Sequence, residues 1–166
     1  MAEKRLLSAD TRAPKNLKKE DIKKKTTELL EKLDELQNRL YASAKHSVLL
    51  VIQGMDASGK DGLIGDVLGQ LNPQGVTVKS YKAPTPEELA HDFLWRIHSA
   101  TPAKGMIQVF NRSHYEDILV TRVHSWCNDA LAVKRMKAIN DFEQLLETHG
   151  NTIIIKIYLH ISQKEQ

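Results

Sequence analysis

The feature that most constrains this chain is an aliphatic run that ends in a glycine-rich segment containing a lysine. Residues 47–53 include five consecutive aliphatic side chains, Val48–Ile52, and are typical of a strand buried on both faces. Residues 54–60 follow directly and have the spacing G-x-x-x-x-G-K. In such a loop the backbone N–H groups turn toward an anion, and the lysine reaches the terminal phosphates. The pattern predicts phosphate binding by Gly54, Met55, Asp56, Ala57, Ser58, Gly59, Lys60, Asp61 and Gly62.

Two carboxylates in this segment indicate a metal ion. The residue after the lysine in such loops is usually Ser or Thr, but here it is Asp61. A carboxylate at Asp56 would repel a phosphate unless a cation lay between them, so we predict that Asp56 is a Mg²⁺ ligand. Two interpretations of Asp61 stay open, a further ligand or a helix-start carboxylate favoured by the helix dipole.

The alternation of patterns along the rest of the chain predicts an α/β fold. The strands are expected at 47–53, 76–81, 106–110 and 153–159, and the helices at 17–45, 59–71, 86–98, 114–125 and 129–148. Strands that alternate with helices form right-handed β-α-β units around a parallel sheet. We therefore expect one domain over residues 17–166, with helices on both faces of the sheet, preceded by a polar arm over residues 1–16.

The long first helix carries a stripe of leucines. Leu29, Leu33, Leu36 and Leu40 recur at a helical spacing of 4-3-4. Two interpretations stay open: the stripe packs on the core of its own domain, or it is the surface for a partner helix in a dimer.

Three polar segments each follow a predicted strand, at 54–60, 82–88 and 111–117. Ligands of parallel sheets bind beyond the carboxyl ends of the strands, so these segments should face one cleft. Phosphoryl transfer depends mainly on positioning and on neutralising oxygen charge. A guanidinium fork suits a phosphate, and this makes Arg112 a candidate. The predicted catalytic residues are Asp56, Lys60, Arg112 and Arg122, with Lys82 and Asn111 as further binding residues.

Composition limits the remaining possibilities. The single cysteine, Cys127, excludes an intramolecular disulfide and a cysteine zinc cluster. No stretch approaches the ~20 apolar residues of a membrane span, and the first residues lack the apolar core of a signal peptide. We therefore predict a cytoplasmic protein that does not enter a membrane. The net charge of +3 suits a polyanionic ligand and does not require nucleic acid.

The amino-acid sequences of four segments resemble one protein family. GMDASGKDG (54–62), KAPTPEELAHDFLWRIH (82–98), FNRSHYEDILVTRVH (110–124) and LHIS (159–162) are similar to the second family of polyphosphate kinases, P-loop proteins related in fold to thymidylate kinase. The resemblance implies Mg²⁺-dependent phosphoryl transfer between inorganic polyphosphate and nucleoside mono- or diphosphates of the AMP/ADP type. It also implies a homo-oligomer, a dimer or a tetramer.

The resemblance also assigns residue roles. It implies that Asp56 holds magnesium, that Gly54, Gly59 and Lys60 hold phosphates, and that Arg112 contacts the phosphates in transfer. Some relatives have an acid in place of Asn111, which leaves metal binding at that position open.

Members of this family continue beyond LHIS into a lid with further arginines and a last strand and helix. In this chain we expect the lid and last strand to be absent, which would lower activity, because lid closure completes such sites. We also expect 153–159 to be an exposed edge strand. Two other functions stay open, an ATP-dependent nucleoside monophosphate kinase and a non-catalytic module that binds phosphate or polyphosphate.

Overall fold

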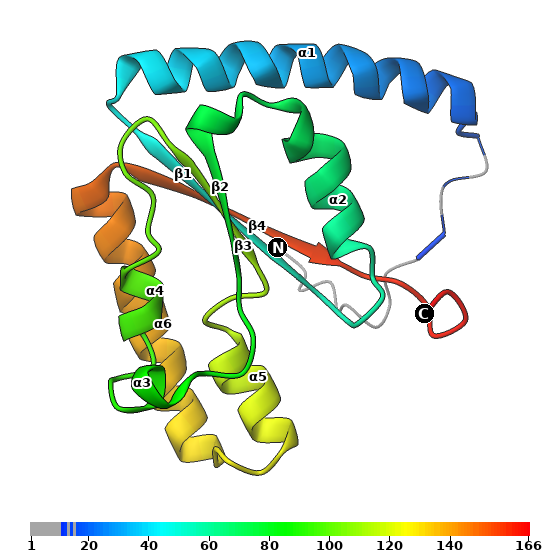
Figure 1. The fold of residues 1–166 in the computed structure, drawn as a ribbon. Helices are drawn as coiled ribbons and strands as arrows, with labels where there is room; N and C mark the ends of the chain where they lie inside the picture. Colours follow the sequence, from blue (N-terminus) through cyan, green and yellow to red (C-terminus); the bar gives the residue numbers. More distant parts are fainter. Residues whose placement is uncertain (1–10, 13, 15) are drawn as a thin grey trace, which may run out of the picture.

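The fold is built on a parallel sheet of four strands (Figure 1). The structure, a computed structural model, describes residues 11–12, 14 and 16–166, so most of the predicted arm lies outside the described residues. The strand order is β2-β3-β1-β4, and every pairing is parallel. The strands are β1 (Ser47–Gly54), β2 (Val76–Ser80), β3 (Ile107–Asn111) and β4 (Thr152–Leu159). The predicted fold class is therefore confirmed.

The helices lie close to the predicted ranges, with one exception. They are α1 (Lys19–Ser43), α2 (Lys60–Val67), α3 (Pro86–Leu89), α4 (Trp95–His98), α5 (Glu116–Val123) and α6 (Asp129–Gly150), with short 3₁₀ turns η2 (Leu68–Gln70) and η3 (Pro73–Gly75). The prediction of one helix over 86–98 is wrong. The side chain of Asp92 accepts a hydrogen bond from the backbone N–H of Leu94 at 2.9 Å. Such a local bond competes with helical pairing, so α3 and α4 are separate.

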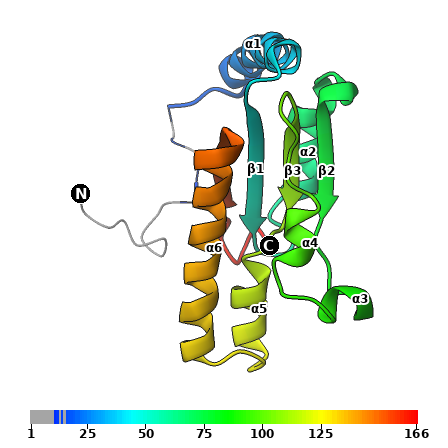
Figure 2. The ribbon, with the colours of Figure 1, turned by 90° about the vertical axis from the view of Figure 1, so that its left-hand side faces the viewer.

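Helices cover both faces of the sheet: Figure 1 shows α2 on one side of the strands and α4, α5 and α6 on the other. Figure 2 shows the strands side by side, with α2 behind β3 and β2. Alternate strand residues point to opposite faces. Leu49 and Val51 of β1 belong to the core cluster that includes Ile139 and Phe142 of α6. Ile52 belongs to a second cluster, against which residues of α2 and α1 pack. The sheet thus has two apolar cores, one on each face.

Helix α1 crosses the end of the sheet where the strands begin, opposite the phosphate loop (Figure 1). Leu33 and Leu40 pack against the second core cluster, whereas Leu29 and Leu36 are 53% and 57% exposed. The leucine stripe therefore divides: one half packs on the domain's own core, as the first interpretation predicts. The other half remains on the surface. Buried Gln37 fixes the helix by donating to the backbone O of Asn72 at 3.2 Å.

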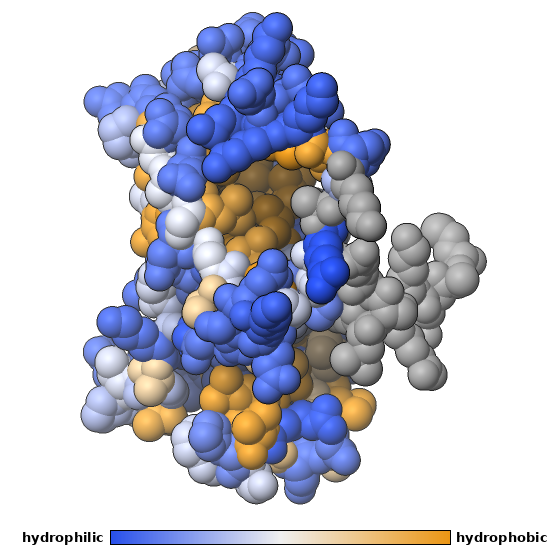
Figure 3. All heavy atoms as spheres, turned by 90° about the vertical axis from the view of Figure 1, so that its right-hand side faces the viewer, coloured by the Kyte–Doolittle hydropathy of each residue, from blue (hydrophilic) through white to orange (hydrophobic). Residues whose placement is uncertain are grey.

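Strand β4 forms one edge of the sheet within the described residues, as expected. Its register pairs Ile155 with Leu50, so Ile155 lies on the same face of the sheet as the second core cluster, against which α2 packs. Ile153 and Ile155 are 52% and 46% exposed. A hollow of apolar surface is visible below α1 in the space-filling view (Figure 3). No helix within the described part of the chain is long and apolar enough to span a membrane.

Candidate active site

The loop after β1 has the backbone geometry of a phosphate cradle. β1 ends at Gly54 and α2 begins at Lys60, so the glycine-rich segment is the turn between them. Gly59 caps the helix with φ of +89°, a conformation that L side chains rarely adopt. Ala57 also has a positive φ, of 60°. These left-handed residues turn the chain so that the N-terminus of α2 points to the end of the sheet, where its unpaired N–H groups favour an anion.

Gly54 is required for a different reason, the close approach of β4. A Cβ built on Gly54 would lie 2.9 Å from the backbone O of Leu159 and 2.5 Å from Oγ of Ser58. The register pairs these two strand ends, Gly54 with Leu159. The loop therefore leaves the sheet in contact with the neighbouring strand, and a side chain at Gly54 would push it away.

Lys60 is held at the base of the loop. Its Nζ donates to the backbone O of Gly54 at 2.9 Å and to that of Met55 at 2.7 Å, and Oγ of Ser58 lies 3.5 Å away. The side chain of Lys60 is buried, although an ammonium is rarely buried without partners. The loop carbonyls thus provide hydrogen bonds to a cation at the place where the terminal phosphates are expected.

The end of β3 meets the phosphate loop through two polar contacts. Arg112 Nη2 donates to Asp56 Oδ1 at 2.6 Å, and Asn111 Nδ2 donates to Asp61 Oδ1 at 2.6 Å. Arg112 has a positive φ of 62°, and its backbone N–H donates to the O of Ile52 at 3.0 Å. The bond to β1 holds this strained turn in place, so the arginine and the two carboxylates lie on the same side of the sheet.

These residues enclose the predicted cleft. A cavity of about 420 Å³ is lined by residues from all three segments, namely Asp56, Ala57, Lys60, Asp61, Ser80, Tyr81, Lys82, Ala83, Asn111 and Arg112. The strand ends meet here because Ser80 and Ile52 both pair with Asn111 in the register. The structure therefore brings together Asp56, Lys60, Arg112 and the predicted binding residues Asp61, Lys82 and Asn111.

Arg122 lies elsewhere. Its Nη2 contacts Oδ1 of Asp129 at 2.6 Å, and both line a second cavity of about 690 Å³ between α5 and α6. This cavity is also lined by Leu119, Val123, Ser125, Cys127 and Asn128. The catalytic role of Arg122 stays a prediction.

The turn that carries Arg112 is anchored by a polar network that we did not predict from the sequence. Glu143 of α6 accepts hydrogen bonds from Tyr115 at 2.9 Å and from Lys156 of β4, and its Oε1 lies 3.2 Å from Nε2 of fully buried His114. Burial alone would raise the pKa of Glu143, but the hydrogen bonds from His114, Lys156 and Tyr115 outweigh it and lower the pKa below its ordinary value. The carboxylate therefore ties the turn to α6 and to β4.

A sequence signal for this network does exist. Glu143 stands four residues after Ile139 and next to Phe142, so an acid interrupts the apolar face of a long helix. A buried acid needs partners, and His114 and Tyr115 in the segment after β3 were available. Arg96 was missed in the same way, because it stands among the apolar residues Leu94, Trp95 and Ile97.

The cleft offers few protein ligands for a metal ion. No group of three or more His, Cys, Asp or Glu side chains in the described residues is placed to hold a metal. Asp56 and Asp61 both line the cleft. Mg²⁺ is usually held by one or two carboxylates together with substrate phosphates, and this donor set fits that arrangement.

A glycine-rich loop between a parallel strand and a helix, with a lysine and an arginine in one cleft, defines a P-loop phosphate-binding protein of the kinase type. The family model described as "Polyphosphate kinase 2 (PPK2)" matches residues 16–166. The chain belongs to this family, and the predicted resemblance is confirmed.

Curated relatives and a solved structure agree with this assignment. The chain is 50% identical over 135 residues to an AMP/ADP-polyphosphate phosphotransferase of Meiothermus ruber, covering 81% of this chain and 50% of the relative. It is 47% identical over 149 residues to an ADP-polyphosphate phosphotransferase of Rhodopseudomonas palustris, covering 82% and 51%. The crystal structure of polyphosphate kinase 2 from Arthrobacter aurescens TC1 superposes with a TM-score of 0.92 at 43% identity, covering 96% of this chain and 58% of that one. The chain thus spans about half the length of these relatives.

Proposed function

We propose that this chain forms the phosphate-binding core of a polyphosphate-dependent nucleotide kinase. In the proposed reaction a terminal phosphate oxygen of ADP or AMP attacks the terminal phosphorus of polyphosphate. The P–O bond to the next phosphate breaks, and the shortened polyphosphate leaves. The observation that carries the proposal is the cleft in which Lys60, Arg112 and Asp56 converge. The family assignment and the printed names of the relatives support the choice of substrates.

The residues of the cleft have separate tasks in this reaction. The loop amides and Lys60 bind phosphate oxygens, and Arg112 neutralises charge that develops during transfer. Asp56 and Asp61 would hold Mg²⁺, which when bound screens the phosphate charges from the two carboxylates. A cytoplasmic location and a homo-oligomeric state, a dimer or a tetramer, remain predictions from the sequence.

A second function, a non-catalytic polyphosphate-binding module, is favoured by one observation. Among the described residues that line the cleft, Arg112 is the single arginine. In related chemistry one added arginine accelerates phosphoryl transfer by about 10³–10⁵-fold. A core with one arginine can therefore bind phosphates well and transfer them slowly.

The test is a donor comparison on the purified chain. ³¹P NMR follows Mg²⁺-containing mixtures of ADP or AMP with either polyphosphate or ATP as donor. The proposal expects that ADP or AMP gains a phosphate only when polyphosphate is the donor. Transfer to AMP from ATP alone would identify an ATP-dependent monophosphate kinase. Binding of polyphosphate without any transfer would favour the binding module.

A further inference from the structure

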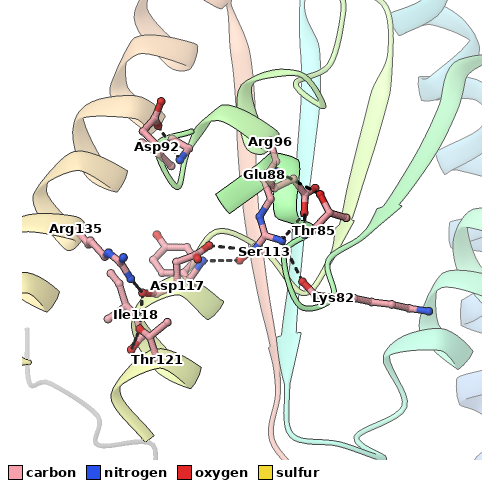
Figure 4. Close-up of polar contacts among 12 residues, drawn as sticks. Lys82, Thr85, Glu88, Asp92, Arg96, Ser113, Asp117, Ile118, Thr121 and Arg135 are labelled. Carbon is pink, nitrogen blue, oxygen red and sulfur yellow. Dashed lines mark hydrogen bonds and ion pairs between the residues drawn. The ribbon is translucent and has the colours of Figure 1, made fainter. Parts of the chain in front are cut away.

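One buried arginine, Arg96, joins the two walls of the cleft. These walls are the segment after β2, which carries Lys82, and the segment after β3, which carries Arg112. Arg96 of α4 donates through Nη1 to the backbone O of Lys82 at 3.0 Å and through Nη2 to Oδ2 of Asp117 at 3.2 Å. Lys82 follows β2 and lines the cleft, and Asp117 lies in α5, five residues after Arg112. Figure 4 shows Arg96 reaching between the segment of Lys82 and the helix of Asp117. A single guanidinium therefore connects the segment after β2 to the segment after β3.

The surroundings of Arg96 keep it in one place. Its side chain is 7% exposed, and Oε2 of Glu88 lies 3.5 Å from Nη1. Glu88 is itself fixed, because its carboxylate accepts from the backbone N–H of Thr85 in the capping box of α3. The guanidinium lies 5.4 Å from the centre of the Tyr81 ring, which packs edge-on against Phe110 of the core. Contacts on several sides leave this fork little freedom.

The link matters for a ligand that touches both walls. A chain of phosphates in the cleft has Lys60 at its floor, Lys82 on one wall and Arg112 on the other. Binding is strongest when these cations are already at the correct separation, since no ordering cost is then paid. A planar fork with five donors can hold two acceptors at once, whereas the single ammonium of a lysine cannot reproduce that geometry.

We propose that Arg96 is a positioning residue that fixes the separation of the Lys82 wall and the Arg112 wall, and thereby sets the affinity of the cleft for polyphosphate. The inference rests on the proposed function, because it takes a chain of phosphates as the ligand. Arg96 acts through the main chain of Lys82 and the carboxylate of Asp117, without contact to the phosphates.

A double-mutant cycle tests this role. Polyphosphate of defined length is titrated calorimetrically, with Mg²⁺, into the wild type, Arg96→Lys, Lys82→Met and the double variant. Each single substitution should weaken binding about tenfold, the effect of losing a charged hydrogen bond. Independent effects would multiply to about a hundredfold loss of affinity in the double variant. If Arg96 acts through Lys82, the double variant should lose much less affinity than that.

Arg135→Lys is the matched control. Arg135 of α6 donates to the backbone O of Asp117 and lies 5.2 Å from the centre of the Phe93 ring. Its replacement loosens α5 in the same place without changing the bond to Lys82. We expect polyphosphate affinity within about twofold of the wild type, which separates the link between the walls from general loosening.

Three results would overturn the inference. They are a fully hundredfold loss in the double variant, unchanged affinity of Arg96→Lys, and an equal loss in Arg135→Lys. If Arg96→Lys does not fold by circular dichroism, Asp117→Asn weakens one arm of the link and takes its place in the cycle with Lys82→Met. A wild type that binds no polyphosphate would refute the proposed function together with this inference, whereas additivity with a binding wild type refutes the inference alone.

Discussion

Replacement of Glu143 by Gln tests how the turn that carries Arg112 is held. The carboxylate of Glu143 is shared by His114, Tyr115 and Lys156. A hydrogen bond to a charged group contributes ~1.5–3 kcal/mol and a neutral one ~0.5–1.5 kcal/mol, so each partner loses about 1 kcal/mol. Lys156 is 48% exposed, and its share is reduced by solvent. We therefore expect Glu143→Gln to lower the free energy of unfolding by about 2–3 kcal/mol, or the melting temperature by about 5–10 °C for a chain of this length.

The pH dependence gives a second, independent readout. Because the folded state lowers the pKa of Glu143, its carboxylate stabilises the fold above the unfolded pKa of about 4.3. That stabilisation is lost as the pH falls through the folded pKa. The difference between wild type and Glu143→Gln should therefore be complete at pH 7 and should shrink steadily below about pH 4.

The assay is urea unfolding followed by circular dichroism at several pH values. Asp141→Asn is the control, because Asp141 lies on the same helix and forms an exposed ion pair with Lys137 at 2.6 Å. Exposed pairs of this kind contribute about 0.3–0.5 kcal/mol. If Glu143→Gln and Asp141→Asn cost the same at pH 7, or if the Glu143 effect does not change with pH, the network does not anchor the turn and our reasoning is refuted.

Three further predictions concern Mg²⁺ binding by Asp56, the phosphate loop at Gly54 and the packing of α1. Asp56→Asn should weaken polyphosphate binding with Mg²⁺ more than without it, and an equal loss by calorimetry in both conditions would make Asp56 structural. Gly54→Ala should cost about 1–3 kcal/mol in urea unfolding and also abolish phosphate binding, because its Cβ would meet the backbone O of Leu159 at 2.9 Å; normal binding would contradict this geometry. Leu33→Ser should lower the free energy of unfolding, measured with urea, by about 2 kcal/mol. Leu36→Ser, at a 57% exposed position, should lower it by less than about 0.5 kcal/mol. Equal losses would refute the observed packing of α1.

Much of the fold followed from local patterns. The aliphatic run 47–53 and the strands that alternate with helices predicted a parallel sheet, because these signals depend on residues near one another in the chain. The break between α3 and α4 was missed because a side-chain bond from Asp92 to the backbone of Leu94 outweighs a periodic apolar pattern. The helix expected over 129–148 also extends farther, to Gly150, because Asn151 takes the left-handed conformation that ends it, with φ of 53°.

The candidate site was predictable where topology alone decides it. Residues that follow parallel strands meet at one edge of the sheet, and for this reason Lys60, Lys82 and Arg112 were expected together and line one cleft. The supporting contacts could not be predicted in this way. Arg96 and Glu143 reach partners distant in sequence, and their pairing depends on how α4 and α6 pack on the sheet. Pairings of that kind are set by tertiary packing and leave only a weak trace in the sequence, a charged residue within an apolar run.

The central claim is that the cleft binds polyphosphate through Lys60, and one titration tests it most directly. Polyphosphate is titrated into the wild-type chain, Lys60→Met and Lys137→Met with Mg²⁺ present, and the fold of each is checked by circular dichroism. Lys137 is an exposed lysine on α6, so its replacement controls for the loss of a positive charge. The account predicts that the wild type and Lys137→Met bind equally and that Lys60→Met, although folded, does not bind. Undiminished binding by folded Lys60→Met would contradict the assignment of the phosphate loop.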